Sequence, residues 1–300
     1  MKAVENVSFH VNEGEAFGLA GESGCGKTTL GLSILRILPP GGFIKEGKIL
    51  FEGKDLVRLD DETLRTEIRW KKISMIFQGA MNALNPVLKI GDQISEAIMI
   101  HEPEVSKRQA RERTAKLLEL VGIDPSRMDN YPHEFSGGMK QRAMIAMALA
   151  CNPKLVIADE PITALDVVVQ AQVMRLLKEL SEKLNLSLIL ITHDLSAMAE
   201  TCDRVAIMYA GKIVELGDVL QVFKEPLHPY TQGLIAAFPD LYAKKTKLVS
   251  IPGQPPDLLN PPPGCRFHVR CKYAMEICKK EEPKLLEVGK DHYVACHLVG

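Results

Sequence analysis

The residues with the plainest chemistry form one glycine-rich run, Gly21-Glu22-Ser23-Gly24-Cys25-Gly26-Lys27-Thr28. This run fits the Gly-x-x-x-x-Gly-Lys-Ser/Thr pattern of a phosphate-binding loop. Its glycines let successive backbone N–H groups point at phosphate oxygens, and the helix that follows adds its positive end. Lys27 supplies a charge for the outer phosphates, and the Thr28 hydroxyl can ligate Mg²⁺. The run therefore predicts a nucleotide site.

A second chemical signal is the acidic pair Asp159-Glu160. It closes the apolar strand Leu155–Ala158, so the carboxylate of Asp159 is expected to project from the sheet edge toward Mg²⁺. Glu160 follows directly and can polarise an attacking water as a general base. Two solvated acids at a strand end are the alternative. The buried strand and the phosphate loop favour the catalytic interpretation.

Two more polar residues follow predicted strands. His193 lies in Ile-Thr-His-Asp, at the carboxyl end of a strand, which is where ligands bind in open α/β sheets. A packing role is the alternative for this histidine. Gln78 follows the strand that ends at Phe77, and its assignment to the site depends on the presence of the other motifs.

Ser136-Gly137-Gly138 leads into a predicted helix over Met139–Ala150, with Ser136 as its N-cap. A serine and two glycines at a helix start make a second anion site. An ordinary capped helix is the alternative. The chain thus carries two helix starts that can bind phosphate.

Alternating strand and helix patterns position these motifs. Strands are predicted at Val4–Val11, Gly14–Ala20, Lys48–Phe51, Ile73–Phe77, Leu155–Ala158, Leu186–Thr192, Val205–Tyr209 and Lys212–Glu215. Helices are predicted at Gly26–Leu38, Asp166–Leu184 and from His228 to about Phe238, with a helical region at Ile90–Leu149. In that region Ser106 and Gln109 fit a capping box, followed by one apolar face: Ala110, Thr114, Leu117, Leu118 and Val121. The rhythm predicts an α/β fold, with a mostly parallel sheet covered on both sides and an inserted helical subdomain.

The bulk composition excludes several classes of protein. Lys and Arg number 37 against 38 Asp and Glu, so no polyanion-binding surface is indicated and we expect no nucleic-acid partner. No apolar stretch approaches the roughly 18 residues of a spanning helix, and the first residues lack a secretion signal. We therefore expect a cytoplasmic chain whose membrane role comes through partners.

Four of the seven cysteines, Cys265, Cys271, Cys278 and Cys296, lie in the last 36 residues. They follow a connector at residues 251–264 that contains six prolines. In a reducing cytosol such a cluster indicates a metal or iron–sulfur site before disulfides. The spacing does not separate zinc from iron–sulfur, and His268, His292 and His297 are possible zinc ligands. Nearby basic residues could offset cluster charge: Arg266, Arg270, Lys272, Lys279 and Lys280.

Taken in order, these motifs resemble the nucleotide-binding subunit of ABC transporters over about residues 1–225. The resemblance implies a P-loop NTPase core and a head-to-tail dimer, with ATP held between the phosphate loop of one subunit and Ser136–Gly138 of the other. It assigns Gln78 to the metal, the attacking water and coupling to the membrane partner. His193 would contact the γ-phosphate, and Asp166, in Ala164-Leu165-Asp166, would communicate across the dimer.

The expected site follows from these assignments. The expected catalytic residues are Glu160, His193 and Gln78. The expected Mg²⁺ ligands are Thr28, Gln78 and Asp159. ATP is expected to contact Gly21, Ser23, Gly24, Gly26, Lys27, Thr28, Thr29, Asp159, Ser136, Gly137, Gly138 and Asp166. An aromatic residue that stacks on adenine upstream of the loop in relatives has no counterpart here, since Phe9 lies in a strand expected to pack inward. We therefore expect weaker ATP binding than in a version extended by that upstream strand.

The cysteine-rich tail, with Phe135-Ser136-Gly137-Gly138-Met139 and His228-Pro229-Tyr230, is similar to that of dipeptide/oligopeptide-importer ATPases. This similarity implies a 4Fe-4S cluster on the four cysteines, with zinc or free thiols as alternatives. It also implies a second ATP-binding subunit, identical or a sister, two membrane permease subunits and, indirectly, a substrate-binding protein. The chain would then lie on the inner face of the cell membrane. An oligosaccharide importer, a soluble ATPase of translation or DNA repair, and a regulator without turnover are the alternatives.

The domain division expected from these patterns has four parts. The P-loop ATPase core takes residues 1–89 and 150–225, and the helical subdomain with the Ser-Gly-Gly motif takes 90–149. A helix and the proline-rich connector take 226–264, and the cysteine-rich extension takes 265–300.

Overall fold

The computed structural model describes residues 1–79, 83–237 and 251–299. The chain divides into two compact units. The first unit comprises Met1–Val11, Ala16–Leu30 and Leu190–Gly300, and the second comprises Asn12–Glu15 and Gly31–Ile189. Helix α1 (Lys27–Leu35) begins in the first unit and ends in the second.

The sheet of the first unit contains, in spatial order, β1 (Ala16–Ala20), β7 (Arg204–Tyr209), β8 (Lys212–Asp218), β10 (His292–Val294) and β9 (Leu286–Gly289). β1 runs parallel to β7, with Gly18 opposite Val205. The pairs β7–β8, β8–β10 and β10–β9 are antiparallel. All residues of β1 are buried, as expected for a parallel strand covered on both faces. The C-terminal extension therefore adds an antiparallel edge to the predicted sheet.

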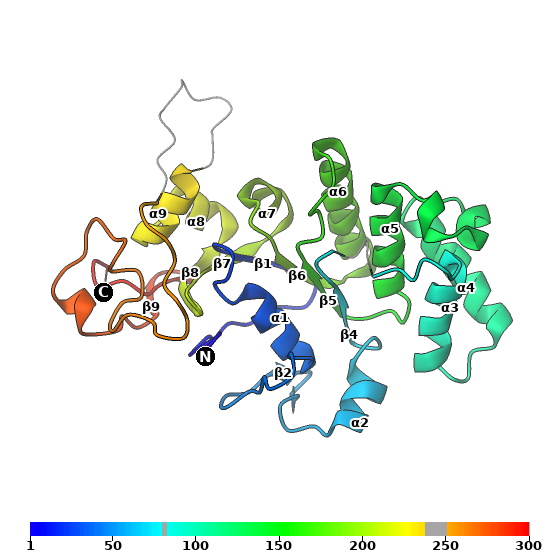
Figure 1. Cartoon of the computed structure of the whole chain (residues 1–300), viewed down its shortest axis with the longest axis horizontal. Helices are drawn as coiled ribbons and strands as arrows, with labels where there is room; N and C mark the ends of the chain where they lie inside the picture. Colours follow the sequence, from blue (N-terminus) through cyan, green and yellow to red (C-terminus); the bar gives the residue numbers. More distant parts are fainter. Residues whose placement is uncertain (80–82, 238–250, 300) are drawn as a thin grey trace. The chain divides into compact units, whose positions relative to one another are not determined.

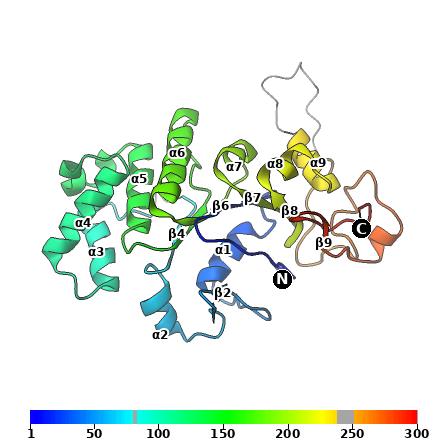
Figure 2. The ribbon, with the colours of Figure 1, turned by 180° about the vertical axis from the view of Figure 1, so that it is seen from behind.

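Three helices accompany this sheet: α7 (Leu195–Thr201), α8 (Val219–Lys224) and α9 (Pro229–Ala236). Each helix follows an N-cap residue whose side chain accepts a backbone N–H of the first turn. The N-cap residues are Asp194, Asp218 and His228, respectively. In both ribbon views α8 and α9 lie beside β8 (Figures 1 and 2). The predicted helix from His228 is thus confirmed, while Phe238 lies outside the described residues.

A buried carboxylate joins β8 to the extension. Glu215 in β8 is fully buried and accepts hydrogen bonds from the backbone N–H groups of Leu227 and His228 at 2.9 and 3.0 Å. Its Oε1 also contacts Nε2 of His292, in β10, at 2.8 Å. The start of α9 and the strand β10 are therefore fixed to the same side chain.

The predicted strand Val4–Val11 is wrong: these residues form no strand in the structure. The Glu5 N–H donates to the carbonyl of Gly211 at 2.9 Å, but a strand needs a repeated ladder of such bonds. Phe9 packs inward as expected and stacks on Phe17, with the ring centroids 4.9 Å apart. The inward position of Phe9 was therefore predicted correctly, but not the backbone that holds it.

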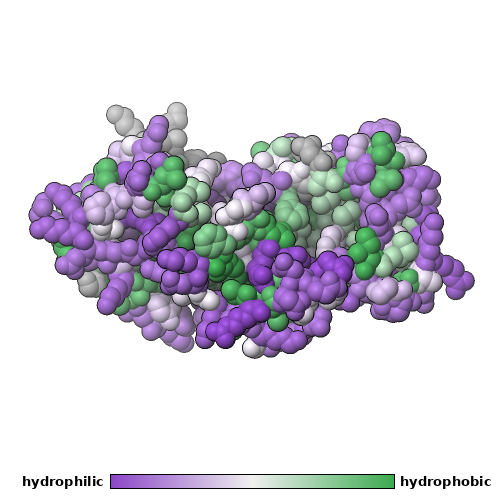
Figure 3. Space-filling model, turned by 60° about the horizontal axis from the view of Figure 1, so that its bottom comes forward, coloured by the Kyte–Doolittle hydropathy of each residue, from purple (hydrophilic) through white to green (hydrophobic). Residues whose placement is uncertain are grey.

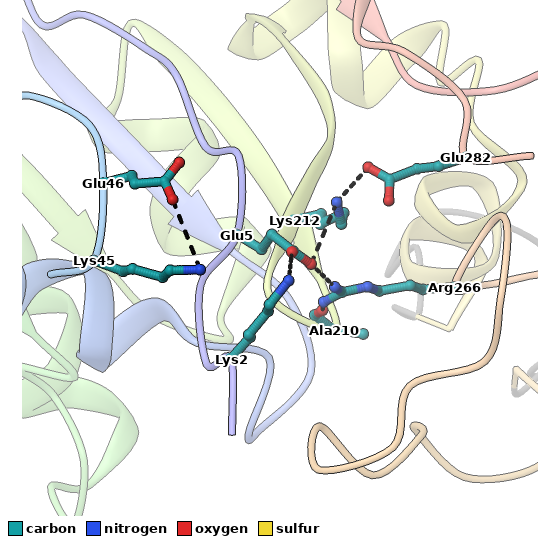
Figure 4. A network of polar contacts seen from close by, with 8 residues as sticks. All are labelled: Lys2, Glu5, Lys45, Glu46, Ala210, Lys212, Arg266 and Glu282. Atoms are coloured by element: carbon teal, nitrogen blue, oxygen red, sulfur yellow. Dashed lines mark hydrogen bonds and ion pairs between the residues drawn. The ribbon is translucent and has the colours of Figure 1, made fainter. Parts of the chain in front are cut away.

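A charged network ties the N-terminal segment to the extension (Figure 4). The Glu5 carboxylate pairs with Lys2, Arg266 and Lys212, and Lys212 also pairs with Glu282. The side chains of Arg266 and Lys212 are only 7% and 12% exposed. Arg266 and Lys212 are therefore shielded from water, whereas Lys2 and Glu282 at the ends of the network are 67% and 47% exposed.

In the second unit, β4 (Ile73–Ile76) and β5 (Leu155–Asp159) run parallel, with Ile76 opposite Ala158. Every residue of both strands is buried. β6 (Ser187–Ile191) is next in strand order and passes into the first unit after Ile189. The short strands β2 (Leu50–Phe51) and β3 (Lys54–Asp55) form a separate hairpin, followed by α2 (Asp61–Thr63) and a π-helical turn η1 (Leu64–Ile68).

The predicted helical insertion is present as α3 (Ile90–His101), α4 (Lys107–Leu120) and α5 (Gly137–Ala148), with single turns η3 (Pro125–Asp129) and η4 (Pro132–Glu134). The capping box at Ser106 and Gln109 is confirmed. The predicted face of this helix is also confirmed, since all its residues are buried: Ala110, Thr114, Leu117, Leu118 and Val121. Both ribbon views show α3, α4 and α5 side by side, with α6 (Val167–Leu184) next to α5.

The remaining described segments carry little regular structure. The connector over residues 251–264 forms neither helix nor strand, as its prolines predict. After it, η5 (Ile277–Lys279) is a single turn before β9. Within residues 1–79, 83–237 and 251–299, no helix combines the length and apolar character that crossing a bilayer requires.

Candidate active site

The phosphate-loop sequence links β1 to α1 and is sharply curled. Gly21, Gly24 and Gly26 all have positive φ angles, of 147°, 81° and 105°. A Cβ atom at Gly21 would lie 2.2 Å from the carbonyl oxygen of Met208, and one at Gly26 would lie 2.5 Å from that of Ala3. The first and sixth positions of the loop therefore require glycine for space as well as for conformation.

The loop lysine lies folded over the loop. Lys27 is 7% exposed, and its Nζ donates to the carbonyl oxygens of Gly21 at 2.7 Å and Glu22 at 3.2 Å. Ser23, Gly24 and Thr28 are exposed. Burial raises the pKa of the Cys25 thiol, so this neighbour of Lys27 stays uncharged at neutral pH. The positive charge of Lys27 is thus held at the loop beside exposed hydrogen-bonding groups.

Glu22, the second residue of the loop, is held by contacts that the sequence did not indicate. Its backbone N–H donates to the hydroxyl of Tyr230 at 2.8 Å. Its carboxylate accepts two hydrogen bonds from Arg270, at 2.6 and 2.9 Å. No local pattern predicts this pair, because the two residues lie 248 positions apart in the chain.

In the second unit the predicted acids emerge at one sheet edge. Since Ile76 lies opposite Ala158, Gln78 and the pair Asp159-Glu160 follow neighbouring parallel strands at the same end. Asp159 is 1% exposed, whereas Gln78 is exposed. The parallel pairing thus places the predicted amide and carboxylates together.

Glu160 has an unusual backbone for a general-base candidate. Its φ of 48° is in the left-handed region, which non-glycine residues occupy mostly at functional sites and turns. The hydroxyl of Thr163 donates to its Oε2 at 3.1 Å. Glu160 thus combines a turn-like backbone with a carboxylate that accepts a hydrogen bond from Thr163.

The proposed magnesium ligands fit the chemistry of that ion. Thr28, Asp159 and Gln78 supply hydroxyl, carboxylate and amide oxygens, which are the hard donors that Mg²⁺ prefers. Asp159 and Gln78 belong to the second unit, and Thr28 to the first.

The Ser-Gly-Gly motif opens α5 as predicted. Ser136 is the N-cap, and its Oγ accepts the N–H of Met139 at 3.3 Å. Asp166 caps α6 by accepting the N–H of Val169 at 3.0 Å. Ser136 and Asp166 are exposed, and Val167 beside the latter is 79% exposed. The two motifs therefore present polar and apolar groups on the surface of the same unit.

The structure divides the predicted residues between the two units. The first contains His193, which is exposed and follows the end of β6, with the loop and the four tail cysteines. The second contains Gln78, Ser136, Gly137, Gly138, Asp159, Glu160 and Asp166.

The four tail cysteines are neighbours but do not form a metal-ligand set. Burial raises the pKa of Cys265 to about 11, and repulsion from Cys278, Cys296 and Cys271 adds to the rise. Burial also raises the pKa of Cys271 and of Cys296. Among the described residues, no group of three or more His, Cys, Asp or Glu side chains is placed to hold a metal. Among these residues the structure therefore does not group the predicted cluster ligands as a metal site.

The histidines considered for zinc also have other contacts. His292 Nε2 contacts Glu215, His268 Nδ1 contacts the carbonyl oxygen of Cys265 at 2.8 Å, and His297 Nε2 contacts that of Glu281 at 3.0 Å. A zinc ligand role for these three is thus not supported in this structure.

Comparison with known proteins decides the family. A family model described as ABC transporter matches residues 4–163, more than half of the chain. The chain belongs to the ABC transporter family. A second model, described as the C-terminal region of oligopeptide/dipeptide transporters, matches residues 214–278 of this ABC ATPase.

Similar curated proteins point to the same branch. The oligopeptide transport ATP-binding protein OppD of Bacillus subtilis (strain 168) is 50% identical over 303 residues, covering 100% of this chain and 84% of that protein. The dipeptide transport ATP-binding protein DppD of the same strain is 50% identical over 301 residues, covering 99% and 89%. The dipeptide protein of Escherichia coli (strain K12) is 46% identical over 298 residues, covering 99% and 90%.

A solved dimeric ATP-binding cassette, in a post-hydrolysis state with ADP and phosphate, is similar with a TM-score of 0.63 and 30% identity. The match covers 72% of this chain and 90% of that one. These findings confirm the predicted family and branch and the ABC-type P-loop fold. The chain is accordingly an ATP-binding, ATP-hydrolysing subunit of an ABC transporter.

Proposed function

We propose that this ABC ATPase energises the uptake of dipeptides and oligopeptides through membrane partners. The observation that carries the proposal is the match of residues 214–278 to the C-terminal region of oligopeptide/dipeptide transporters. Relatives named for oligopeptide or dipeptide transport match essentially the whole chain, in support of the same substrate class. No feature of the described residues favours an oligosaccharide over a peptide.

In this proposal the loop from Gly21 to Thr29 binds the phosphates of ATP. The backbone N–H groups donate to phosphate oxygens, and Lys27 exchanges the carbonyl oxygens of Gly21 and Glu22 for phosphate oxygens. That exchange is favourable because a hydrogen bond between two charged groups is stronger than one to a neutral carbonyl. Mg²⁺, when bound, neutralises charge on the phosphates.

Three residues would carry the hydrolytic step. Glu160 accepts a proton from the attacking water, and its left-handed backbone supports this role because non-glycine residues in that conformation cluster at functional sites. Gln78, at the same sheet edge, orients the water and the metal. His193 donates a hydrogen bond to the γ-phosphate. Loss of the Glu160 carboxylate should therefore slow phosphate release more than it weakens ATP binding.

We propose further that ATP is enclosed by a second ATP-binding subunit, identical or a sister. Ser136, Gly137 and Gly138 would cover the nucleotide of the partner, and Asp166 would communicate across the contact. Apolar exposure beside Asp166 supports a partner there, since Val167 and Val168 are 79% and 67% exposed. On the face drawn in Figure 3, hydrophobic patches interrupt a largely hydrophilic surface.

The remaining partners follow from the transport role. Two membrane permease subunits would bind this chain at the inner face of the cell membrane, and a substrate-binding protein would deliver the peptide to them. The proposed division keeps the core at 1–89 and 150–225, the helical subdomain at 90–149, the connector at 226–264 and the extension at 265–300. The relatives' transport names support the membrane partners.

The 4Fe-4S cluster on Cys265, Cys271, Cys278 and Cys296 stays a separate prediction, with zinc as the alternative. Its support is the position of the four cysteines within the last 36 residues and the match of residues 214–278 to the C-terminal region of oligopeptide/dipeptide transporters. The test is the iron, sulfide and zinc content of the chain purified without oxygen. About four irons per chain, lost in Cys271→Ser, are expected, whereas a chain without iron removes the prediction.

The proposed function is tested by purifying the chain with co-expressed permease subunits and placing the complex in lipid vesicles. With a peptide-loaded binding protein, we expect ATP hydrolysis to rise and labelled peptide to enter the vesicles. A binding protein loaded with oligosaccharide serves as the competing substrate. Stimulation by the sugar and not by the peptide would reassign the cargo.

A further inference from the structure

Arg270, in the C-terminal extension, lies against the phosphate loop. Its Nη1 and Nη2 donate to the two carboxylate oxygens of Glu22, at 2.6 and 2.9 Å. From this geometry we propose that Arg270 is a positioning residue for the phosphate loop, so that the extension tunes nucleotide binding. The proposal rests on the role given above to the loop from Gly21 to Thr29.

The arginine cannot easily move away from the loop. Its side chain is only 5% exposed. The Nε donates to the carbonyl of Pro252 at 2.8 Å, and the guanidinium lies over the ring of Tyr209, 5.7 Å from the centroid. A two-pronged pair with a carboxylate fixes orientation as well as charge. Arg270 therefore holds the carboxylate of Glu22 in one place.

An aromatic cluster secures the backbone of the same loop residue. The Tyr230 hydroxyl accepts the Glu22 N–H at 2.8 Å, and Tyr230 itself is fully buried. Its ring packs against Tyr209 at 4.6 Å and against Phe267, from the extension, at 5.4 Å. Glu22 is thus held at its N–H and its carboxylate, in both cases by residues from beyond position 208.

The charges explain why this contact bears on ATP. Glu22 would otherwise place an uncompensated negative charge in a loop that binds a highly negative triphosphate, and like charges disfavour each other at short range. Arg270 neutralises that carboxylate. The carbonyl of Glu22 also accepts from Nζ of Lys27 at 3.2 Å, so a shift of Glu22 moves a group that holds the phosphate-binding lysine.

The alternative is that the pair merely clips the extension to the core. Arg266 provides a matched control, since it also lies in the extension, is also buried, and pairs with Glu5 rather than with the loop. Loss of either arginine should weaken the fold. Only loss of Arg270 should change how the loop binds nucleotide.

The experiment measures MgATP and MgADP affinity of the full chain by calorimetric titration, alongside melting temperature. For Arg270→Met we expect roughly tenfold weaker MgATP binding, with a smaller loss for MgADP because ADP carries less charge. For Arg266→Met we expect a similar drop in melting temperature with MgATP affinity within about threefold of wild type. Adding Glu22→Gln to Arg270→Met removes the uncompensated charge and should restore MgATP affinity to within about threefold.

If Arg270→Met binds MgATP with wild-type affinity, the proposal is wrong. It is also wrong if adding Glu22→Gln to Arg270→Met does not restore MgATP affinity. If Arg270→Met does not fold, Arg270→Lys keeps the charge but loses the two-pronged geometry. About threefold weaker MgATP binding by Arg270→Lys supports the proposal, and unchanged binding by this variant contradicts it. Lys27→Ala tests the nucleotide-binding role of the loop separately from the role of Arg270. If this variant binds MgATP normally, the assignment of the loop itself is wrong.

Discussion

Gly138 and Val169 are in direct packing contact, and this contact joins two motifs that lie apart in the sequence. A Cβ atom at Gly138 would lie 2.6 Å from Cγ1 of Val169. Gly138 belongs to the Ser-Gly-Gly start of α5, and the N–H of Val169 is the group that Asp166 caps. The two elements proposed to meet a partner subunit therefore support each other within one chain.

The first prediction concerns Gly138→Ala. The added methyl group overlaps Val169, and such overpacking costs about 1–3 kcal/mol and displaces the helix start. We expect ATP hydrolysis to fall at least about tenfold, and Val169→Ala in the same chain to recover most of it by making room. Steady-state phosphate release and thermal melting of both single variants and the double variant provide the check. No recovery in the double variant would mean that Gly138 matters for a reason other than space.

The second prediction concerns the composite site. Lys27→Ala disables the phosphate loop, and Ser136→Arg blocks the motif offered to a partner, so each variant alone should be inactive. In a head-to-tail dimer, a mixture of the two contains one intact site per mixed dimer, and about a quarter of wild-type hydrolysis should return at equal amounts. Phosphate release is measured across mixing ratios. If no ratio restores activity, two copies of this chain do not share the site.

The third prediction concerns Glu5 and acid stability. A hydrogen bond from Lys2, with the charges of Lys212 and Arg266, holds the pKa of the Glu5 carboxyl below its usual value. A carboxylate with a lowered pKa stabilises the fold above its unfolded-state pKa, and this contribution is lost as the pH falls through the folded-state value. Glu5→Gln should therefore lower the free energy of unfolding by about 1 kcal/mol at pH 7, with the difference shrinking below about pH 4.

Urea unfolding of wild type and Glu5→Gln at several pH values provides the measurement. Lys45→Met, which removes an exposed ion pair with Glu46, is a control expected to change stability by less than about 0.5 kcal/mol. A Glu5→Gln deficit that persists unchanged at pH 3.5 would rule out the carboxylate as its source.

Local patterns carried most of the fold that was predicted correctly. The run from β1 through the glycine-rich loop to α1, the buried strand β5 and the capped helix α4 each depend on residues close together in the chain. Hydrophobic periodicity and capping residues report such local preferences directly. For the same reason the local sequence predicts Ser136 as an N-cap, and in the structure its Oγ accepts the N–H of Met139.

Non-local contacts account for what the sequence did not reveal. Val4–Val11 has the apolar character of a strand but no ladder partner, and the structure anchors it through Glu5 and Phe9 instead. The contact of Arg270 with Glu22 spans almost the whole chain, and charge alone offered many alternative partners. Cysteine spacing likewise predicted a metal or iron–sulfur site, but among the described residues no group of side chains is placed to hold a metal, because spacing does not fix the direction of each thiol.

The measurement that tests the account most directly is peptide-stimulated phosphate release by the membrane complex in vesicles, comparing wild type with Glu160→Gln. Wild type should release phosphate faster when the binding protein carries a peptide. Glu160→Gln should bind MgATP normally while phosphate release falls by at least about 100-fold, because the general base is lost. Phosphate release by Glu160→Gln at the wild-type rate would contradict the proposed peptide-import ATPase. So would a wild-type rate of phosphate release that does not change when the binding protein carries a peptide.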